Sequence, residues 1–118
     1  MVDAAIVILA DTEGHENLGR IVNALETAKE FVQNDEDSVE VIFDGAGTEW
    51  IPEIADPGSD QYELFAAVRD EAVACAYCAE AFGVKEEVTE ANVDTRTENE
   101  GHPSIRSLVA DGYEVITY

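Results

Sequence analysis

The segment Ala4-Ala5-Ile6-Val7-Ile8-Leu9-Ala10 is an unbroken apolar run close to the start of the chain. A short apolar run without alternation is typical of a central strand in a parallel sheet, because both faces of such a strand are buried. The polar segment Asp11-Thr12-Glu13-Gly14 follows, and then a pattern of helical period begins. This order predicts that the chain is an α/β protein with residues 4–10 at the centre of its sheet.

Strands and helices are predicted to alternate along the rest of the chain. The apolar stripe of a long helix over 16–33 consists of Leu18, Ile21, Val22, Leu25, Ala28 and Val32. Further strands are expected over 39–43, 72–75, 92–95 and 113–118, and further helices over 61–70, 85–91 and the segment that Pro103 opens. Five strands separated by helical segments favour a three-layer α/β/α sandwich with a five-stranded, mainly parallel sheet, in a single domain over 1–118.

The charge of the chain is strongly negative, and it limits the partners. There are 27 acidic and six basic residues, which gives a formal net charge of −21 over 118 residues. The acids are dispersed between apolar positions, as on a folded acidic surface, and such a surface favours a halophilic protein in a salt-rich cytoplasm. Six scattered cations form no basic patch, so the sequence predicts binding neither to nucleic acid nor to an anionic membrane.

The apolar segments are short, and no membrane attachment is expected from them. No apolar run approaches the roughly 20 residues of a membrane span. No basic segment precedes the first apolar run, so a signal peptide is not expected either. The predicted location is the cytoplasm, where a C-x-x-C pair is more often redox-active, sulfur-carrying or metal-binding than a structural disulfide.

The two cysteines of the chain lie in the segment Cys75-Ala76-Tyr77-Cys78. They follow the apolar residues 72–74 and precede a short helix that Gly83 ends, so Cys75 is expected at the carboxyl end of a strand. The free N–H groups of the next helix are expected to lower the pKa of Cys75 and make it the reactive thiolate. Cys78, one turn further on, is then the poorer thiolate and the resolving partner.

Other interpretations of the cysteine pair remain open. A thioredoxin-like protein also uses C-x-x-C at the start of a helix, and both cysteines could instead be small buried hydrophobic residues. His15 and His102 are placed in loops at the same edge of the sheet, where they could act as binding residues of the site, stabilise a thiolate or shuttle a proton. Two cysteines and two histidines could also form a tetrahedral zinc site, but the histidines lack the paired spacing of such a site, so no metal and no cofactor are expected.

Residues 44–54 contain two ambiguous features. Asp44-Gly45-Ala46-Gly47 is similar to the start of a dinucleotide loop, but the third glycine and the long helix are missing, so a flexible turn is expected. Trp50, Ile51 and Ile54 form an apolar cluster that either covers the core or contacts another subunit.

The chain resembles the DsrE/DsrF-like family, which is related to sulfur relay. The resemblance rests on the apolar strand before Cys75 and Cys78 and on the eight-residue spacing from Cys75 to Gly83; it is also carried by AAIVILA, by AKEF at 28–31 and by GYEV at 112–115. It covers nearly the whole chain. It implies a flavodoxin-like layered fold, a homotrimer or hexamer, and a persulfide carried on Cys75.

The function expected from these features is that of a cytoplasmic sulfur-relay protein with a persulfide on a strand-end cysteine, and with sulfur donor and acceptor proteins as partners. The alternatives are a non-catalytic binding or structural subunit of an oligomer and a C-x-x-C thiol redox protein.

Overall fold

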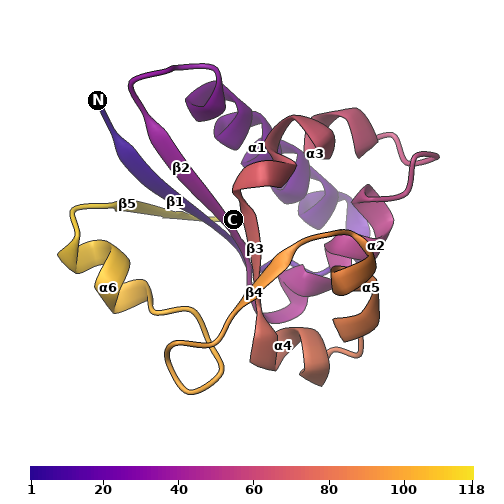
Figure 1. The fold of residues 1–118 in the computed structure, drawn as a ribbon. Coiled ribbons are helices and arrows are strands. Elements are labelled where there is room, and N and C mark those ends of the chain that lie inside the picture. The colour runs from indigo at the N-terminus through magenta and orange to yellow at the C-terminus, as the bar shows by residue number, and fades with distance from the viewer.

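The computed structural model describes residues 1–118 and contains one five-stranded sheet (Figure 1). All neighbouring strands are parallel, and their order across the sheet is β4-β3-β2-β1-β5. The bounds of the strands are Asp3–Ile8 for β1, Ser38–Phe43 for β2, Ala72–Cys75 for β3, Asp94–Arg96 for β4 and Glu114–Thr117 for β5. The predicted three-layer, flavodoxin-like α/β fold is thereby confirmed.

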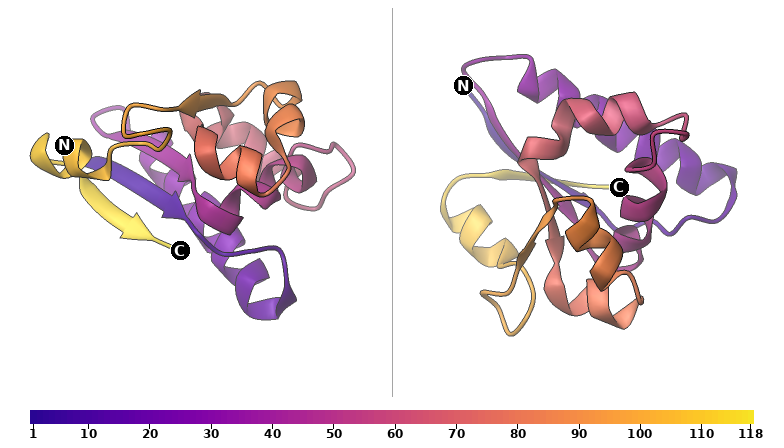
Figure 2. Two further views of the ribbon diagram at one scale, coloured as in Figure 1. Left: turned by 90° about the horizontal axis from the view of Figure 1, so that it is seen from below. Right: turned by 45° about the vertical axis from the view of Figure 1, so that its right-hand side comes forward.

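The helices are divided unequally between the two faces of the sheet (Figures 1 and 2). Their bounds are Gly14–Val32 for α1, Gly45–Glu49 for η1, Trp50–Ile54 for α2, Tyr62–Val68 for α3, Arg69–Glu71 for η2, Ala76–Ala81 for α4, Lys85–Glu90 for α5 and Ile105–Ala110 for α6. The chain steps from β1 to β4 in one direction, so right-handed crossovers place the helices between those strands on one face. The return from β4 to β5 places α6 on the other face.

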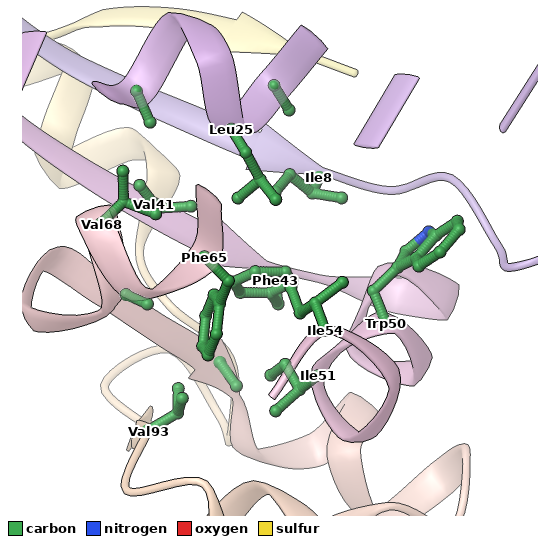
Figure 3. Packing of buried hydrophobic residues seen from close by; sticks show 14 of the residues in the cluster. Ile8, Leu25, Val41, Phe43, Trp50, Ile51, Ile54, Phe65, Val68 and Val93 are labelled. Atoms are coloured by element: carbon green, nitrogen blue, oxygen red, sulfur yellow. The ribbon is translucent and has the colours of Figure 1, made fainter. Parts of the chain in front are cut away.

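The main hydrophobic core lies between the sheet and the helices from α1 to α5 (Figure 3). Ile6 and Ile8 of β1 point into it, as do Val41 and Phe43 of β2. Phe43 meets Phe65 of α3 edge to face, with 6.2 Å between the ring centroids. This core contains 22 buried residues and fixes the positions of β1, β2 and β3.

The opposite face of the sheet is covered thinly. Its buried cluster has four members, Ala5, Val7, Ile42 and Leu108, and Leu108 comes from the short helix α6. Glu40 shares this face with Ile42 because side chains alternate along a strand. Its carboxylate is 2.8 Å from the guanidinium of Arg96, which reaches it from β4. A parallel sheet is normally covered on both faces, and here a single short helix and its flanking segments bury the centre of the second face.

Two residues that were predicted to belong to the apolar stripe of α1 are exposed. Leu18 is 40% exposed and Val32 is 38% exposed. The residues that α1 buries are Ile21, Ala24, Leu25 and Ala28, which form a narrower stripe than the sequence pattern indicated. Leu18 and Val32 lie nearer the two ends of α1, whereas the buried residues lie in its middle turns, so apolar spacing alone does not lead to burial.

Trp50, Ile51 and Ile54 belong to the core, which resolves the two interpretations of this cluster. Trp50 is 3% exposed and the two isoleucines are fully buried (Figure 3). The indole N–H of Trp50 donates to the carbonyl oxygen of Ala10 at 3.1 Å. None of the three is available for a subunit contact.

The glycine-rich segment after β2 is a packed 3-10 helix rather than a flexible turn. Gly47 is buried, and a Cβ atom placed there would lie 1.9 Å from the carbonyl oxygen of Ile8. Glycine is therefore needed for this close approach of η1 to the end of β1. The contact fixes the loop that begins at Asp44.

The last helix begins later than predicted. Ser104 caps α6, with its hydroxyl accepting the N–H of Ser107 at 3.3 Å, so Pro103 lies before the helix and is buried there.

None of the helices combines the length and the apolar composition needed to cross a bilayer.

Candidate functional site

Three strand ends place reactive side chains at one edge of the sheet. Cys75 is the last residue of β3, and Asp44 directly follows β2, its neighbour. The loop after β4, on the other side of β3, carries His102. Parallel strands end at the same edge, so the fold brings these residues together with Cys78 of α4.

The sulfur of Cys75 is fully buried and has three neighbours. It lies 3.2 Å from Nδ1 of His102, a hydrogen-bond distance for a thiol and an imidazole. The backbone N–H of Cys78 donates to the same sulfur at 3.4 Å. The carbonyl oxygen of Gly101 lies 3.8 Å away and can accept the S–H. The side chain is thus enclosed and has a base in contact.

Cys78 has a different environment in the first turn of α4. It is half-buried, and its thiol donates to Oδ1 of Asp44 at 3.4 Å. The same carboxylate oxygen accepts the N–H of Gly45 at 2.9 Å, which holds Asp44 in place. Cys78 is therefore the more accessible of the two sulfurs, and its neighbour is a carboxylate rather than an imidazole.

A tight turn holds His102 against the cysteines. Asn99 and His102 exchange backbone hydrogen bonds of 2.8 and 2.9 Å, and φ is +51° at Glu100 and +94° at Gly101. Positive φ at both central residues is the pattern of a type I′ turn. The N–H of Tyr77 donates to the carbonyl oxygen of Gly101 at 2.9 Å, and the rings of Tyr77 and His102 lie 4.7 Å apart. Backbone bonds and ring contact together orient the imidazole.

Glu98 supports this turn from outside. Its carboxylate accepts the N–H of Ser104 at 3.1 Å and pairs with Arg96 at 3.3 Å. The hydrogen bond from Ser104 is the main reason why the pKa of Glu98 is lowered, and Arg96 adds to it. Glu98 therefore links one end of the segment that carries His102 to β4 and the other end to the start of α6.

The expectation of a lowered pKa at Cys75 is wrong. The pKa of Cys75 is raised to about 12, chiefly by burial of the sulfur, and the nearby Asp44 and Cys78 contribute to the rise. The N–H of Cys78 lowers the pKa, as expected from the helix start, but it does not outweigh the loss of hydration. Cys75 therefore rests as a thiol at neutral pH.

The two histidines are separated by the fold. His102 contacts Cys75, whereas His15 is exposed in the first turn of α1 and makes no contact with the cysteines. Asp44, which sequence reasoning did not consider as a site residue, is a member of the cluster. Its position directly after a predicted strand was the available signal, because such a residue lies at the same edge as Cys75.

The cluster has the composition of a ligand set but no adjoining cavity. One donor atom from each of Asp44, Cys75, Cys78 and His102 lies within 4.8 Å of the other three. The surface cavities of the molecule are lined by other residues, such as one of about 310 Å³ beside Tyr62 and Arg69. The site is therefore suited to a single atom or ion, not to a bulky organic ligand.

Comparisons with known proteins identify similar chains of unknown function. The chain is 29% identical over 80 residues to the uncharacterized protein MJ0733 of Methanocaldococcus jannaschii; the match covers 68% of this chain and 65% of that protein. Its structure is similar to that of a conserved protein of unknown function, BT1422 from Bacteroides thetaiotaomicron. That likeness has a TM-score of 0.60 at 15% identity and covers 97% and 94% of the two chains. It shows a shared fold. No protein-family model matches the chain.

Proposed function

We propose that the protein is a sulfur carrier that accepts a sulfane sulfur on Cys75, as a sulfur-relay protein of the DsrE/DsrF-like type would. The observation that carries this proposal is the 3.2 Å contact between the sulfur of Cys75 and Nδ1 of His102. A buried thiol becomes a nucleophile when an adjacent base takes its proton during the attack, and the imidazole is placed to do so.

Loading would be a thiol exchange with balanced atoms. The sulfur of Cys75 attacks the outer sulfur of a donor persulfide, and the sulfur–sulfur bond of the donor breaks. A new persulfide forms on Cys75, and the donor leaves as a thiolate. His102 takes the proton of the Cys75 thiol and returns it to that leaving thiolate. No oxidant is needed, because the sulfane sulfur keeps its oxidation state in the exchange.

Cys78 supplies a route for release when no acceptor protein is present. Its sulfur lies within 4.8 Å of the sulfur of Cys75. Attack by Cys78 on the inner sulfur of the persulfide forms a Cys75–Cys78 disulfide and expels hydrosulfide. A cytoplasmic dithiol or glutathione then reduces the disulfide by two electrons. The enclosed site favours this chemistry, because the cargo is a single sulfur atom.

The proposal is tested by loading the reduced protein with a small persulfide and measuring intact mass. One sulfur atom, ~32 Da, should be added per chain to the wild type and to Cys78→Ser, and the adduct should persist longer in the variant. Cys75→Ser should gain no sulfur. Uptake by Cys75→Ser but not by Cys78→Ser would reverse the roles, and equal failure of the wild type would refute sulfur carriage.

The proposed assembly is a homo-oligomer, a trimer or a hexamer. The thin cover of the sheet face opposite α1 supports it, because parallel sheets are usually covered by helices on both faces and α6 is the one short helix that packs there. Light scattering in molar salt should then give a multiple of the 12.8 kDa chain mass. A mass equal to one chain would exclude this assembly. The same proposal includes sulfur donor and acceptor proteins as partners and a salt-rich cytoplasm as the location.

A further inference from the structure

The four side chains at the edge of β2, β3 and β4 also have the chemistry of a metal site. Two thiols, one imidazole and one carboxylate converge from three separate segments of the chain. Zinc takes these three ligand types in tetrahedral sites, and C-x-x-C is a common spacing for its first two ligands. The expected absence of a metal rested on histidine spacing, and it did not consider a ligand from the end of β2.

The distances between the donor atoms match a tetrahedron of that size. Metal–sulfur bonds of about 2.3 Å and metal–nitrogen or metal–oxygen bonds of about 2.0 Å give edges of roughly 3.3–3.8 Å. The sulfur of Cys75 is 3.2 Å from Nδ1 of His102, and the sulfur of Cys78 is 3.4 Å from Oδ1 of Asp44. All other separations between the four atoms are at most 4.8 Å. Shifts of about 1 Å or less would complete the geometry.

The surroundings of the cluster also suit a cation. The ion pairs of the structure involve Asp37, Glu16, Glu40 and Glu98, and none involves Asp44. No lysine or arginine therefore neutralises the half-buried Asp44 carboxylate. The N–H of Cys78 points at the sulfur of Cys75, and the N–H of Gly45 holds the ligand oxygen of Asp44. Such outer hydrogen bonds orient metal ligands and temper their charge.

We propose that Asp44, Cys75, Cys78 and His102 bind one Zn²⁺ ion, with one donor atom each. Binding converts both thiols into metal-bound thiolates and displaces their protons to solvent. The ion and a persulfide on Cys75 need the same sulfur atom, so zinc-loaded chains cannot accept sulfur. The inference does not require the proposed sulfur transfer, since the metal site stands on the ligand geometry alone.

The test is a titration of reduced, chelator-treated protein with Co²⁺, a spectroscopic substitute for Zn²⁺. We expect an absorption from thiolate-to-cobalt charge transfer and the intense visible bands of tetrahedral cobalt, saturating at one ion per chain. Zn²⁺ should displace the cobalt and abolish both. An excess of Mg²⁺ should not, which separates this site from weak binding to the many surface carboxylates.

Matched variants identify the ligands. His102→Ala and Asp44→Asn should each weaken cobalt binding at least about tenfold and alter the visible bands. His15→Ala and Asp60→Asn, at exposed positions away from the cluster, should behave as the wild type. Circular dichroism checks that each variant is folded, and His102→Gln replaces His102→Ala if the latter is not.

The outcomes separate the two proposals. Absence of the charge-transfer band at one equivalent, or identical spectra for His102→Ala, Asp44→Asn and the wild type, would overturn the metal site. If the metal-free protein then still loads sulfur, sulfur carriage survives. If the metal binds as expected but the metal-free protein takes up no sulfur, the metal site stands and sulfur carriage fails.

Discussion

The carboxyl edge of the sheet has two halves with opposite properties. The half formed by β2, β3 and β4 carries Asp44, both cysteines and His102, and no cavity opens beside them. The half formed by β1 and β5 has a cavity of about 310 Å³ between Leu9, Arg20 and Tyr118, and it contains no thiol. Sequence reasoning had placed His15 and His102 at one edge, and the fold divides them between these halves.

The difference shows that the cavity at this edge and the cluster of thiols, imidazole and carboxylate do not coincide in space. Ligands of open α/β sheets commonly bind where the strand order reverses, which here is between β1 and β5. Cys75 and its neighbour His102 lie elsewhere, at the end of β3 and in the loop after β4. The absence of a cavity at the cluster favours a cargo of atomic size, whether a sulfane sulfur or a metal ion.

The largest predicted effect is the pH dependence of Cys75 when its base is removed. In metal-free His102→Ala with Cys78→Ser, thiolate must form by simple ionisation of a buried thiol; burial is the main reason why the pKa of Cys75 is raised to about 12 in the wild type. Because that pKa is raised, thiolate is scarce at neutral pH and grows about tenfold per pH unit. Alkylation by a small reagent should therefore accelerate about 10³-fold from pH 8 to pH 11. An alkylation rate that reaches a plateau below pH 9 would show that the pKa of the Cys75 thiol is not raised. It would contradict the described effect of burial.

The second prediction compares the two histidines directly. At pH 7 His102→Ala should slow sulfur uptake by Cys75 about 10²-fold, the usual loss when a general base is removed. His15→Ala should leave the rate unchanged, because His15 is exposed on α1 and distant from the thiols. The rate of adduct formation in metal-free protein measures both. Equal rates for all three proteins would remove His102 from the mechanism.

The third prediction compares two glycines, Gly47 in η1 after β2 and Gly19 in α1 after β1. Gly47→Ala should destabilise the fold by about 3 kcal/mol, because its Cβ would meet the carbonyl oxygen of Ile8. Gly19→Ala, in α1 with no atom near the new Cβ, should stabilise the fold by about 0.5–1 kcal/mol. Denaturant unfolding of both variants measures the two effects. A Gly47→Ala variant as stable as the wild type would mean that η1 does not pack on β1 as described.

The smallest predicted effect comes from salt, and it should act on both halves alike. Four ion pairs engage four of the 27 acidic side chains, so most of the negative charge is uncompensated. As salt falls from molar to ~0.1 M, the Debye length rises to ~10 Å and the acids repel one another. The melting temperature should fall by several degrees. An unchanged melting temperature would remove the halophilic interpretation.

Much of the fold could be predicted from local patterns. The apolar runs at 4–10, 39–43 and 72–75 correspond to β1, β2 and β3, and the strand-end position of Cys75 followed from them. The exposed ends of α1 and the buried position of Trp50 could not be read from period or composition. Both depend on tertiary packing, which decides which side chains of a helix are buried.

The site was predicted only in part, because its geometry is non-local. The sequence predicted Cys75, Cys78 and His102 as candidates, but the contact of His102 depends on a turn with positive φ at Glu100 and Gly101. The raised pKa of Cys75 depends on burial by surrounding segments, whereas the lowering N–H of Cys78 is local and was foreseen. Local electrostatics were therefore predictable and desolvation was not.

The central claim is that Cys75, not the more accessible Cys78, receives the sulfur. Trypsin should cut after Arg69 and Lys85, so both thiols fall in one peptide and fragmentation must locate the adduct. After persulfide loading of metal-free wild-type protein and trapping with a small alkylating reagent, the extra ~32 Da should lie on Cys75, whose thiol has the adjacent base. Location of the sulfur on Cys78, with Cys75 alkylated and unmodified, would contradict the account.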